Sequence, residues 1–311
     1  MSRDRTVPIL VAALAAAAAL GPLLPDWMLF LLTIALSKGL VILGLVLCLR
    51  AGLVSFGQAL YFCIGGYAGG ALGRFWHVSD VLLVMLAGMT AAGLAALALG
   101  FLMAKYRGIF FGLLSLALSM ILYGLLVKTE AFGSTDGFNV LPFTLFGIRP
   151  AEAWVRYVLL VVVCTVVAVA AIAVNRFLAT PLGQLAPAIK DNEIRVEYMG
   201  ASARYAIHVN YVVAGALAGL GGAFVAAAVG HIDPEMAYWT TSGEFIFVTI
   251  LGGTGSVIAP FLGAIMFYAV QSFAFDLSPN TWQMVLGTAL LLVIVFLPNG
   301  LWSVFTRRQR A

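Results

Sequence analysis

The chain has 311 residues, of which 63% are hydrophobic and only 10% are charged, and its formal net charge is +4. A soluble domain carries about 25% charged residues, so this composition excludes one, and the mean hydropathy of +1.06 indicates a membrane protein. A transmembrane β-barrel needs alternating apolar and polar residues, whereas "VLLVVVCTVVAVAAIAV" (158–174) is continuously apolar. We therefore predict one all-α domain over residues 1–311, a polytopic transmembrane helical bundle with about 8–10 membrane segments, some of them broken or re-entrant.

Apolar segments follow one another along most of the chain. We predict membrane segments near 7–25, 28–49, 53–73, 81–103, 109–127, 154–178, 206–230, 242–273 and 281–298. The segment 242–273 is too long for one straight span, and "LGGTGS" (251–256) interrupts it. We expect two shorter pieces there, which either enter and return or both cross.

The first segment has two readings. "MSRDRTVPILVAALAAAAALG" has the basic start, short apolar run and small residues of a signal peptide. It also fits an uncleaved first membrane helix. We favour the helix, because further membrane segments follow it and no soluble mature domain does.

Lys38 lies near the centre of the second segment. A lysine at the bilayer centre costs about 2.5–3.5 kcal/mol on insertion scales, so its side chain should face the bundle interior, a cavity or a partner subunit. It could attract an anionic group of a substrate. It could equally form a structural pair with a carboxylate or with backbone carbonyls.

Two glycine-rich stretches interrupt the apolar pattern in corresponding positions of the two halves. They are "AGLVSFGQALYFCIGGYAGGALG" (51–73) and "SGEFIFVTILGGTGSVIAPFLGA" (242–264). Such a pair is typical of a translocation path near the bilayer midplane. Close helix packing through GxxxG pairs is the alternative, and it fits better for Gly215 and Gly219. Our candidate path residues are Lys38, Ser55, Gly57, Gln58, Gly65, Tyr67, Gly252, Gly253, Gly255 and Ser256.

The basic residues predict the orientation, because cytoplasmic loops are enriched in Lys and Arg. With both termini in the cytoplasm, that side collects Arg3, Arg5, Arg50, Lys105, Arg107, Arg176, Lys190, Arg195, Arg204, Arg307, Arg308 and Arg310. The other side then collects most of the acidic residues. It includes the loop 128–153, in which "GSTDGFN" (133–139) has the composition of turns.

The segment "PLGQLAPAIKDNEIRVEYMG" (181–200) concentrates charge in a chain that otherwise avoids it. Pro181 can start a short helix and Gly200 can end one. Within it, Asp191 and Arg195 are spaced as an i,i+4 pair. We predict a cytoplasmic loop at 179–205 that contains a short amphipathic helix.

One face of this short helix should be apolar, with Ile189, Val196 and Met199 on it and Glu193 nearby. The charges of the segment are mixed in sign, which suits a protein partner better than anionic lipid. A solvated loop with a helix lying along the membrane is the alternative.

Sequence signatures of catalysis are missing. The chain has no G-x-x-x-x-G-K-[ST] motif and no evident Ser/His/Asp or metal-ligand cluster. We therefore expect no catalytic residue, metal or cofactor on this chain, and any ATP should be bound by partner subunits. An ion-coupled carrier would more often show carboxylates inside its spans, and Glu244 comes closest to that position.

Several motifs, in order, resemble the branched-chain amino acid (LivM-type) permeases of ABC importers. They are "AGLVSFGQALYFCIGGYA" (51–68), "YRGIFFGLLSLALSMILY" (106–123), "TPLGQLAPAIKDNEIRVEYMGASARYAIHVNYVVAGALAGLGGAFVA" (180–226) and "ILGGTGSVIAPFLGA" (250–264). The resemblance to that family's cytoplasmic loop rests on Gly183, Ala188, Ile189, Lys190, Asp191, Asn192, Glu193 and Gly200.

The resemblance implies a multi-pass subunit of the cell inner membrane. It implies a homologous second permease, two cytoplasmic ATPase subunits that dock on the short loop helices, and a periplasmic solute-binding protein. The substrate would be a branched-chain amino acid or a related small polar solute such as urea, an amide or an aromatic acid. Membrane lipid would surround the chain, and no nucleic acid is expected. A stand-alone secondary transporter and a non-transport membrane scaffold are the alternatives.

Overall fold

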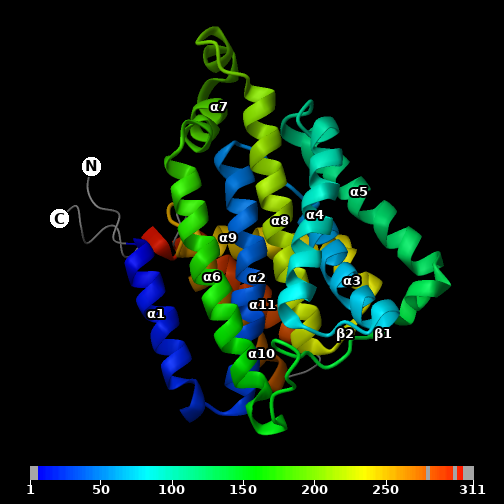
Figure 1. The fold of residues 1–311 in the computed structure, drawn as a ribbon. Coiled ribbons are helices and arrows are strands. Elements are labelled where there is room, and N and C mark those ends of the chain that lie inside the picture. The colour runs from blue at the N-terminus through cyan, green and yellow to red at the C-terminus, as the bar shows by residue number, and fades with distance from the viewer. Residues whose placement is uncertain (1–5, 278–280, 297–299, 304–311) are drawn as a thin grey trace.

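A computed structural model describes residues 6–277, 281–296 and 300–303 of the chain. Eleven α-helices make up most of this part: α1 Thr6–Leu20, α2 Asp26–Arg50, α3 Gln58–Trp76, α4 Val81–Met103, α5 Gly108–Lys128, α6 Val155–Ala179, α7 Pro181–Tyr198, α8 Ala203–Val229, α9 Trp239–Gly252, α10 Ala259–Leu277 and α11 Trp282–Phe296. The all-α prediction is confirmed (Figure 1).

Short elements fill the connections. They are the 3₁₀ turns η1 Gly21–Leu23, η2 Glu130–Phe132, η3 Ser134–Asp136, η4 Glu152–Trp154 and η5 Pro234–Ala237, and the strands β1 Phe138–Asn139 and β2 His231–Ile232. The strands pair antiparallel and join the loop between α5 and α6 to the end of α8. The predicted turn at 133–139 is confirmed, since Gly133 and Gly137 have φ of 84° and 66° on either side of η3.

Seven helices in the described part are long and apolar enough to cross a membrane. They correspond to the predicted segments near 7–25, 28–49, 81–103, 109–127, 154–178 and 206–230, and to the second piece of 242–273. α3 starts at Gln58 rather than at residue 53, and the residues 51–57 before it are not helical. α11 covers the last predicted segment, of which residues 297–298 lie outside the described residues.

The predicted break in segment 242–273 is confirmed, since α9 ends at Gly252 and α10 begins at Ala259. α9 has 14 residues, which is about 21 Å of helix and too short to cross a hydrocarbon core of about 30 Å. α10 packs back along α9.

α8 is the centre of the bundle, with α2, α3 and α4 packed around it. Small residues allow these helices to approach closely. A Cβ added to Gly219 would lie 2.2 Å from Cβ of Ala92 on α4, and one added to Gly215 would lie 2.4 Å from Cβ of Ala96. The packing role predicted for Gly215 and Gly219 is therefore confirmed.

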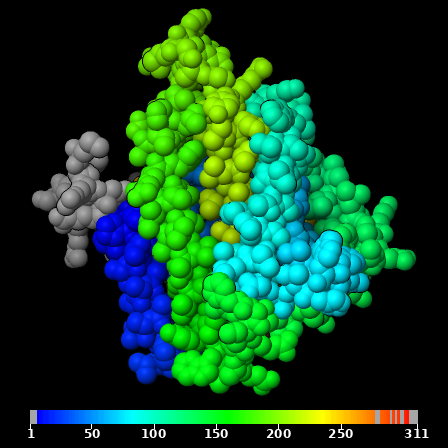
Figure 2. Space-filling view, in the orientation of Figure 1, coloured from blue at the N-terminus to red at the C-terminus, as the bar shows by residue number. Residues whose placement is uncertain are grey.

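The space-filling view shows α8 (yellow) in the gap between α6 (green) and α4 (cyan) (Figure 2). This gap is an apolar groove of about 680 Å³, with Met89, Val169 and Leu217 among its lining residues. The hydroxyl of Thr165, which also lines it, donates to the carbonyl of Val161 in its own helix. The groove therefore presents an apolar surface.

The connections between the helices lie at two ends of the bundle. α7, the α4–α5 turn and the connection after α2 lie at one end, and much of the connection from α5 to α6 lies at the other (Figure 1). Arg50, Arg107 and Lys190 belong to the α7 end, which agrees with the predicted grouping of basic residues. Arg3, Arg5, Arg307, Arg308 and Arg310, also predicted on that side, lie outside the described residues.

Candidate translocation path and coupling helix

α7 forms as predicted but consists of two helical pieces. Thr180 caps the first piece, its hydroxyl accepting from the N–H of Gly183 at 3.3 Å, and Pro181 follows at the first helical position. Asn192 leaves the helical conformation (φ −161°, ψ 98°). Its side-chain oxygen accepts from the N–H of Arg195 at 2.9 Å and so caps the second piece. Gly200, with φ of 84°, follows the end of the helix.

The break at Asn192 overturns one prediction. Asp191 and Arg195 do not form an i,i+4 ion pair, and neither residue belongs to any ion pair within the part of the chain that the structure describes. The predicted spacing requires continuous helix, and Asn192 interrupts it between the two residues. Both side chains are exposed instead.

The buried face of α7 differs from the predicted one at its end. Ile189 and Val196 are buried as expected, together with Gly183 and Ala186, but Met199 is 69% exposed. The helix ends at Tyr198, so Met199 no longer follows the helical face. Gly183 is packed so closely that a Cβ there would lie 2.3 Å from the carbonyl oxygen of Phe177.

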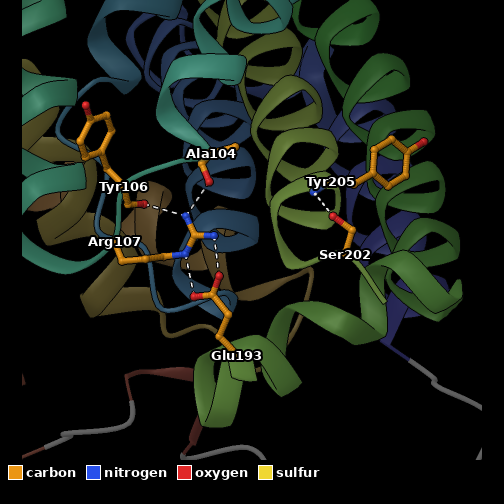
Figure 3. A network of polar contacts seen from close by, with 6 residues as sticks. All are labelled: Ala104, Tyr106, Arg107, Glu193, Ser202 and Tyr205. Carbon is orange, nitrogen blue, oxygen red and sulfur yellow. Dashed lines mark hydrogen bonds and ion pairs between the residues drawn. The ribbon is translucent and has the colours of Figure 1, made fainter. Parts of the chain in front are cut away.

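Glu193 fastens α7 to the transmembrane bundle. Its two carboxylate oxygens accept from Nε and Nη2 of Arg107 at 2.9 and 2.7 Å (Figure 3). Nη1 of Arg107 also donates to the carbonyls of Ala104 and Tyr106, at 2.7 and 2.8 Å. A bidentate pair restricts both position and orientation, so one guanidinium joins the α4–α5 turn to α7. Arg107 was missed as a functional residue, although it stands in the quoted "YRGIFFG" motif.

The remaining predicted residues of α7 divide by exposure. Ala188 is half-buried against the core, whereas Lys190, Asp191, Asn192 and Gly200 are exposed. Ile194, Tyr198 and Met199 add exposed apolar surface, 67%, 88% and 69% exposed. Residues 190–200, which we call the tip of α7, therefore present both charged and apolar groups.

Hydroxyl groups from two other helices accept from backbone N–H groups just before α3 and in its first turn. The N–H of Phe56 donates to Oγ of Ser115 on α5 at 2.9 Å, and the N–H of Ala59 donates to Oγ of Ser242 on α9 at 3.1 Å. Irregular backbone at membrane depth survives only where protein groups or water satisfy it. Sequence reasoning missed Ser115 and Ser242, whose only signal is a small hydroxyl within an apolar helix.

The predicted path residues beside this break are buried. Oγ of Ser55 accepts from the N–H of Gly57 at 3.3 Å. Gln58 is fully buried, with Nε2 at 4.0 Å from Sγ of Cys48 and Oε1 without a hydrogen-bond partner among the described residues. Here α3 begins inside the bundle.

The second break lies close to the first. Gly253 has φ of 90° where α9 ends, and Oγ of Ser256 accepts from the N–H of Ile258 at 3.4 Å. Gly252 packs tightly, since its Cβ would lie 2.4 Å from the carbonyl oxygen of Ala259, whereas Gly255 is exposed. Nε of Arg50 donates to the carbonyl of Thr254 at 3.1 Å. The two predicted irregular stretches therefore meet at the end of α2.

A third irregular stretch was not predicted. After β2, η5 reaches the middle of α5, where the hydroxyl of Ser119 donates to the carbonyl of Ala237 at 2.7 Å. The chain between α8 and α9 thus enters the bundle before α9 starts. Only this long-range contact reveals how deep the segment lies.

Gly65 and Tyr67 lie away from the two breaks. A Cβ on Gly65 would be 2.0 Å from the carbonyl oxygen of Gly219, so the position serves close packing of α3 on α8. The hydroxyl of Tyr67 has no partner among the described residues, and the ring borders an apolar cavity of about 220 Å³ between α3 and α5. A pathway role for these two residues stays a prediction, and the contacts of Gly65 do not support one.

Lys38 has a carboxylate partner. Its Nζ lies 3.2 Å from Oε1 of Glu244 on α9 and 4.5 Å from the ring centre of Tyr268 on α10. The structural pair considered from the sequence is therefore present.

This arrangement defines a class of protein: a polytopic helical membrane protein with broken helices inside its bundle and a helix at one end anchored by an ion pair. The family described as "Branched-chain amino acid transport system / permease component" matches residues 27–295. The chain belongs to this family, as its motifs suggested.

Two similar curated proteins are also named as permeases of branched-chain amino acid transport. The chain is 28% identical over 291 residues to the high-affinity branched-chain amino acid transport system permease protein LivM of Escherichia coli (strain K12), covering 86% of this chain and 67% of the relative. The LivM protein of Salmonella typhimurium (strain LT2) matches with the same identity and coverage. No solved structure matches the chain.

Proposed function

We propose that this chain is the membrane-spanning permease subunit of an ATP-binding-cassette importer in the cell inner membrane, with both termini in the cytoplasm. The observation that carries the proposal is the construction of α7. It is anchored through Glu193 to Arg107 at the α4–α5 turn, while its tip is exposed. A helix built in this way can transmit a push from a bound partner to the transmembrane helices.

The chain itself carries no ATP in this proposal. Two cytoplasmic ATPase subunits dock on the exposed tip of α7 and on that of a homologous second permease. When the two ATPase subunits bind ATP, they close together and move α7. The Arg107–Glu193 pair then transmits this movement to α4 and α5. A periplasmic binding protein delivers the solute from the other side. The substrate is a branched-chain amino acid, in line with the relatives' names.

Purification of a tagged chain from its native membrane tests the proposal. We expect two kinds of partner, an ATP-binding subunit and a second permease of this family, to be identified in the purified complex by mass spectrometry. The complex should hydrolyse ATP faster when leucine-loaded binding protein is added. A chain that purifies without an ATP-binding subunit, and that moves solute in liposomes under an ion gradient, would instead be a stand-alone secondary transporter.

A further inference from the structure

Three polar side chains from three helices meet in the middle of the membrane-spanning bundle. Lys38 is the midpoint of α2, about 18 Å from either end of that helix. Oε1 of Glu244 accepts from Nζ of Lys38 at 3.2 Å and from the hydroxyl of Tyr268 at 2.5 Å. The ring of Tyr268 also lies against the ammonium group.

Both members of the ion pair keep accessible surface. The side chains of Lys38 and Glu244 keep 18% and 24% of their accessible surface. Beyond its chain neighbours and its own helix backbone, no atom of the described residues lies within 4 Å of the place where a Cβ on Gly243, next to Glu244, would stand. A small solute can therefore approach the pair.

Both charged groups have unused hydrogen-bonding capacity. Lys38 has further N–H groups beyond the one directed at Glu244. Both hydrogen bonds received by Glu244 end on Oε1, and no described residue bonds to Oε2. The free donors and the free acceptor thus lie side by side, one cationic and one anionic.

We propose that Lys38 and Glu244 form a transient binding site for the zwitterionic head of an amino acid, an inference that rests on the proposed function. Nζ of Lys38 binds the substrate's carboxylate, and Oε2 of Glu244 accepts from its ammonium group. The substrate's two charges replace part of the Lys38–Glu244 contact, so no group is left with an unmatched charge at the midplane. Tyr268 holds Oε1 in place meanwhile.

This site discriminates by charge pattern. An amino acid satisfies both members of the pair, whereas a monocarboxylate satisfies Lys38 alone and leaves Glu244 facing a like charge. Urea offers no ionic group to either. The pair therefore favours amino acids over the uncharged and singly charged solutes considered from the sequence.

Neutralising both charges at once separates this role from a structural ion pair. The complete transporter is reconstituted in liposomes and supplied with leucine-loaded binding protein and ATP. The variants are Lys38→Gln, Glu244→Gln and the double variant Lys38→Gln/Glu244→Gln, whose amides can still bond to each other. Asp26→Asn/Arg156→Gln is the matched control, because it removes an exposed pair 3.8 Å apart at the start of α2.

Maximal leucine uptake should fall about tenfold or more in both single variants and in the double variant, the size expected for one lost charge-assisted hydrogen bond. The unfolding temperature of the double variant should stay close to that of wild type, and the control should transport normally. A double variant that regains wild-type uptake, or that unfolds at a much lower temperature, shows a structural pair and overturns the site. A wild-type transporter without ATP-dependent leucine uptake refutes the proposed function itself, and the site falls with it.

Discussion

Single hydroxyl groups make the broken helices of this bundle possible. Ser115, Ser119 and Ser242 each bond to backbone at a place where the helical pattern stops. An unpaired backbone group in hydrocarbon costs several kcal/mol, so these serines stabilise an otherwise unfavourable backbone. Each one acts far from its own position in the sequence.

Arg107 and Glu193 determine how α7 sits on the bundle. Glu193→Lys should reduce uptake and ATPase association by about fivefold, because it removes a bidentate pair coupled by about 1 kcal/mol and places two cations together. Membrane insertion should be unchanged, since α7 lies outside the spans. Uptake and co-purified ATPase are measured against the amount of inserted chain.

The charge swap Arg107→Glu/Glu193→Lys is the control for this pair. It restores opposite charges and should recover part of the lost uptake, although the lysine cannot form the bidentate contact. Normal uptake by Glu193→Lys alone would remove the anchoring role.

At the scale of helices, glycine decides how closely the elements pack. α8 packs closely on both α3 and α4 because Gly65, Gly215 and Gly219 have no side chain of their own at these contacts. Without a hydrophobic drive between helices in lipid, such close van der Waals contact is a main source of association. From the sequence, Gly65 was a candidate path residue with close packing as the alternative, whereas Gly215 and Gly219 fitted packing better.

Gly65→Ala tests which role applies at that position. The added methyl group meets the backbone of α8, so the variant should lose about 1–3 kcal/mol of stability from overpacking. The unfolding temperature of the purified chain in detergent measures the effect. Gly124→Ala on α5 is the control, since in the described part of the chain only its own helix backbone and chain neighbours approach the added Cβ within 4 Å. A stable Gly65→Ala variant with altered uptake would restore the pathway role.

At the scale of the whole molecule, the connections between helices lie at two ends of the bundle. The end with α7 carries Arg50, Arg107 and Lys190, and the other end carries the loop with η2, η3 and β1. Cytoplasmic loops are rich in Lys and Arg, so the proposed orientation places α7 in the cytoplasm.

Labelling with a membrane-impermeant maleimide tests this orientation. Asp191→Cys and Thr135→Cys place thiols at exposed positions on opposite ends, and the native Cys48, Cys63 and Cys164 are buried. In spheroplasts only Thr135→Cys should react, and in inverted vesicles only Asp191→Cys. Reaction of Asp191→Cys in spheroplasts would place α7 in the periplasm and end the proposal of ATPase docking.

The sequence by itself determined the class of the protein and most of its elements. Long apolar runs specify spans, because lipid leaves the backbone little choice but helix. α7 was also predictable from local sequence, since Pro181 can start a helix, Gly200 can end one and the charges between them exclude a membrane span. The motif "LGGTGS" marked the break between α9 and α10.

Only the tertiary structure decided which groups meet. It paired Lys38 with Glu244, Arg107 with Glu193 and Phe56 with Ser115, and it brought the 230–238 segment to the middle of α5. It also broke α7 at Asn192, where a side-chain cap competes with continued helix. Local sequence carries periodicity and turn chemistry, whereas the partners of polar groups buried in a bundle depend on how separate helices are packed together.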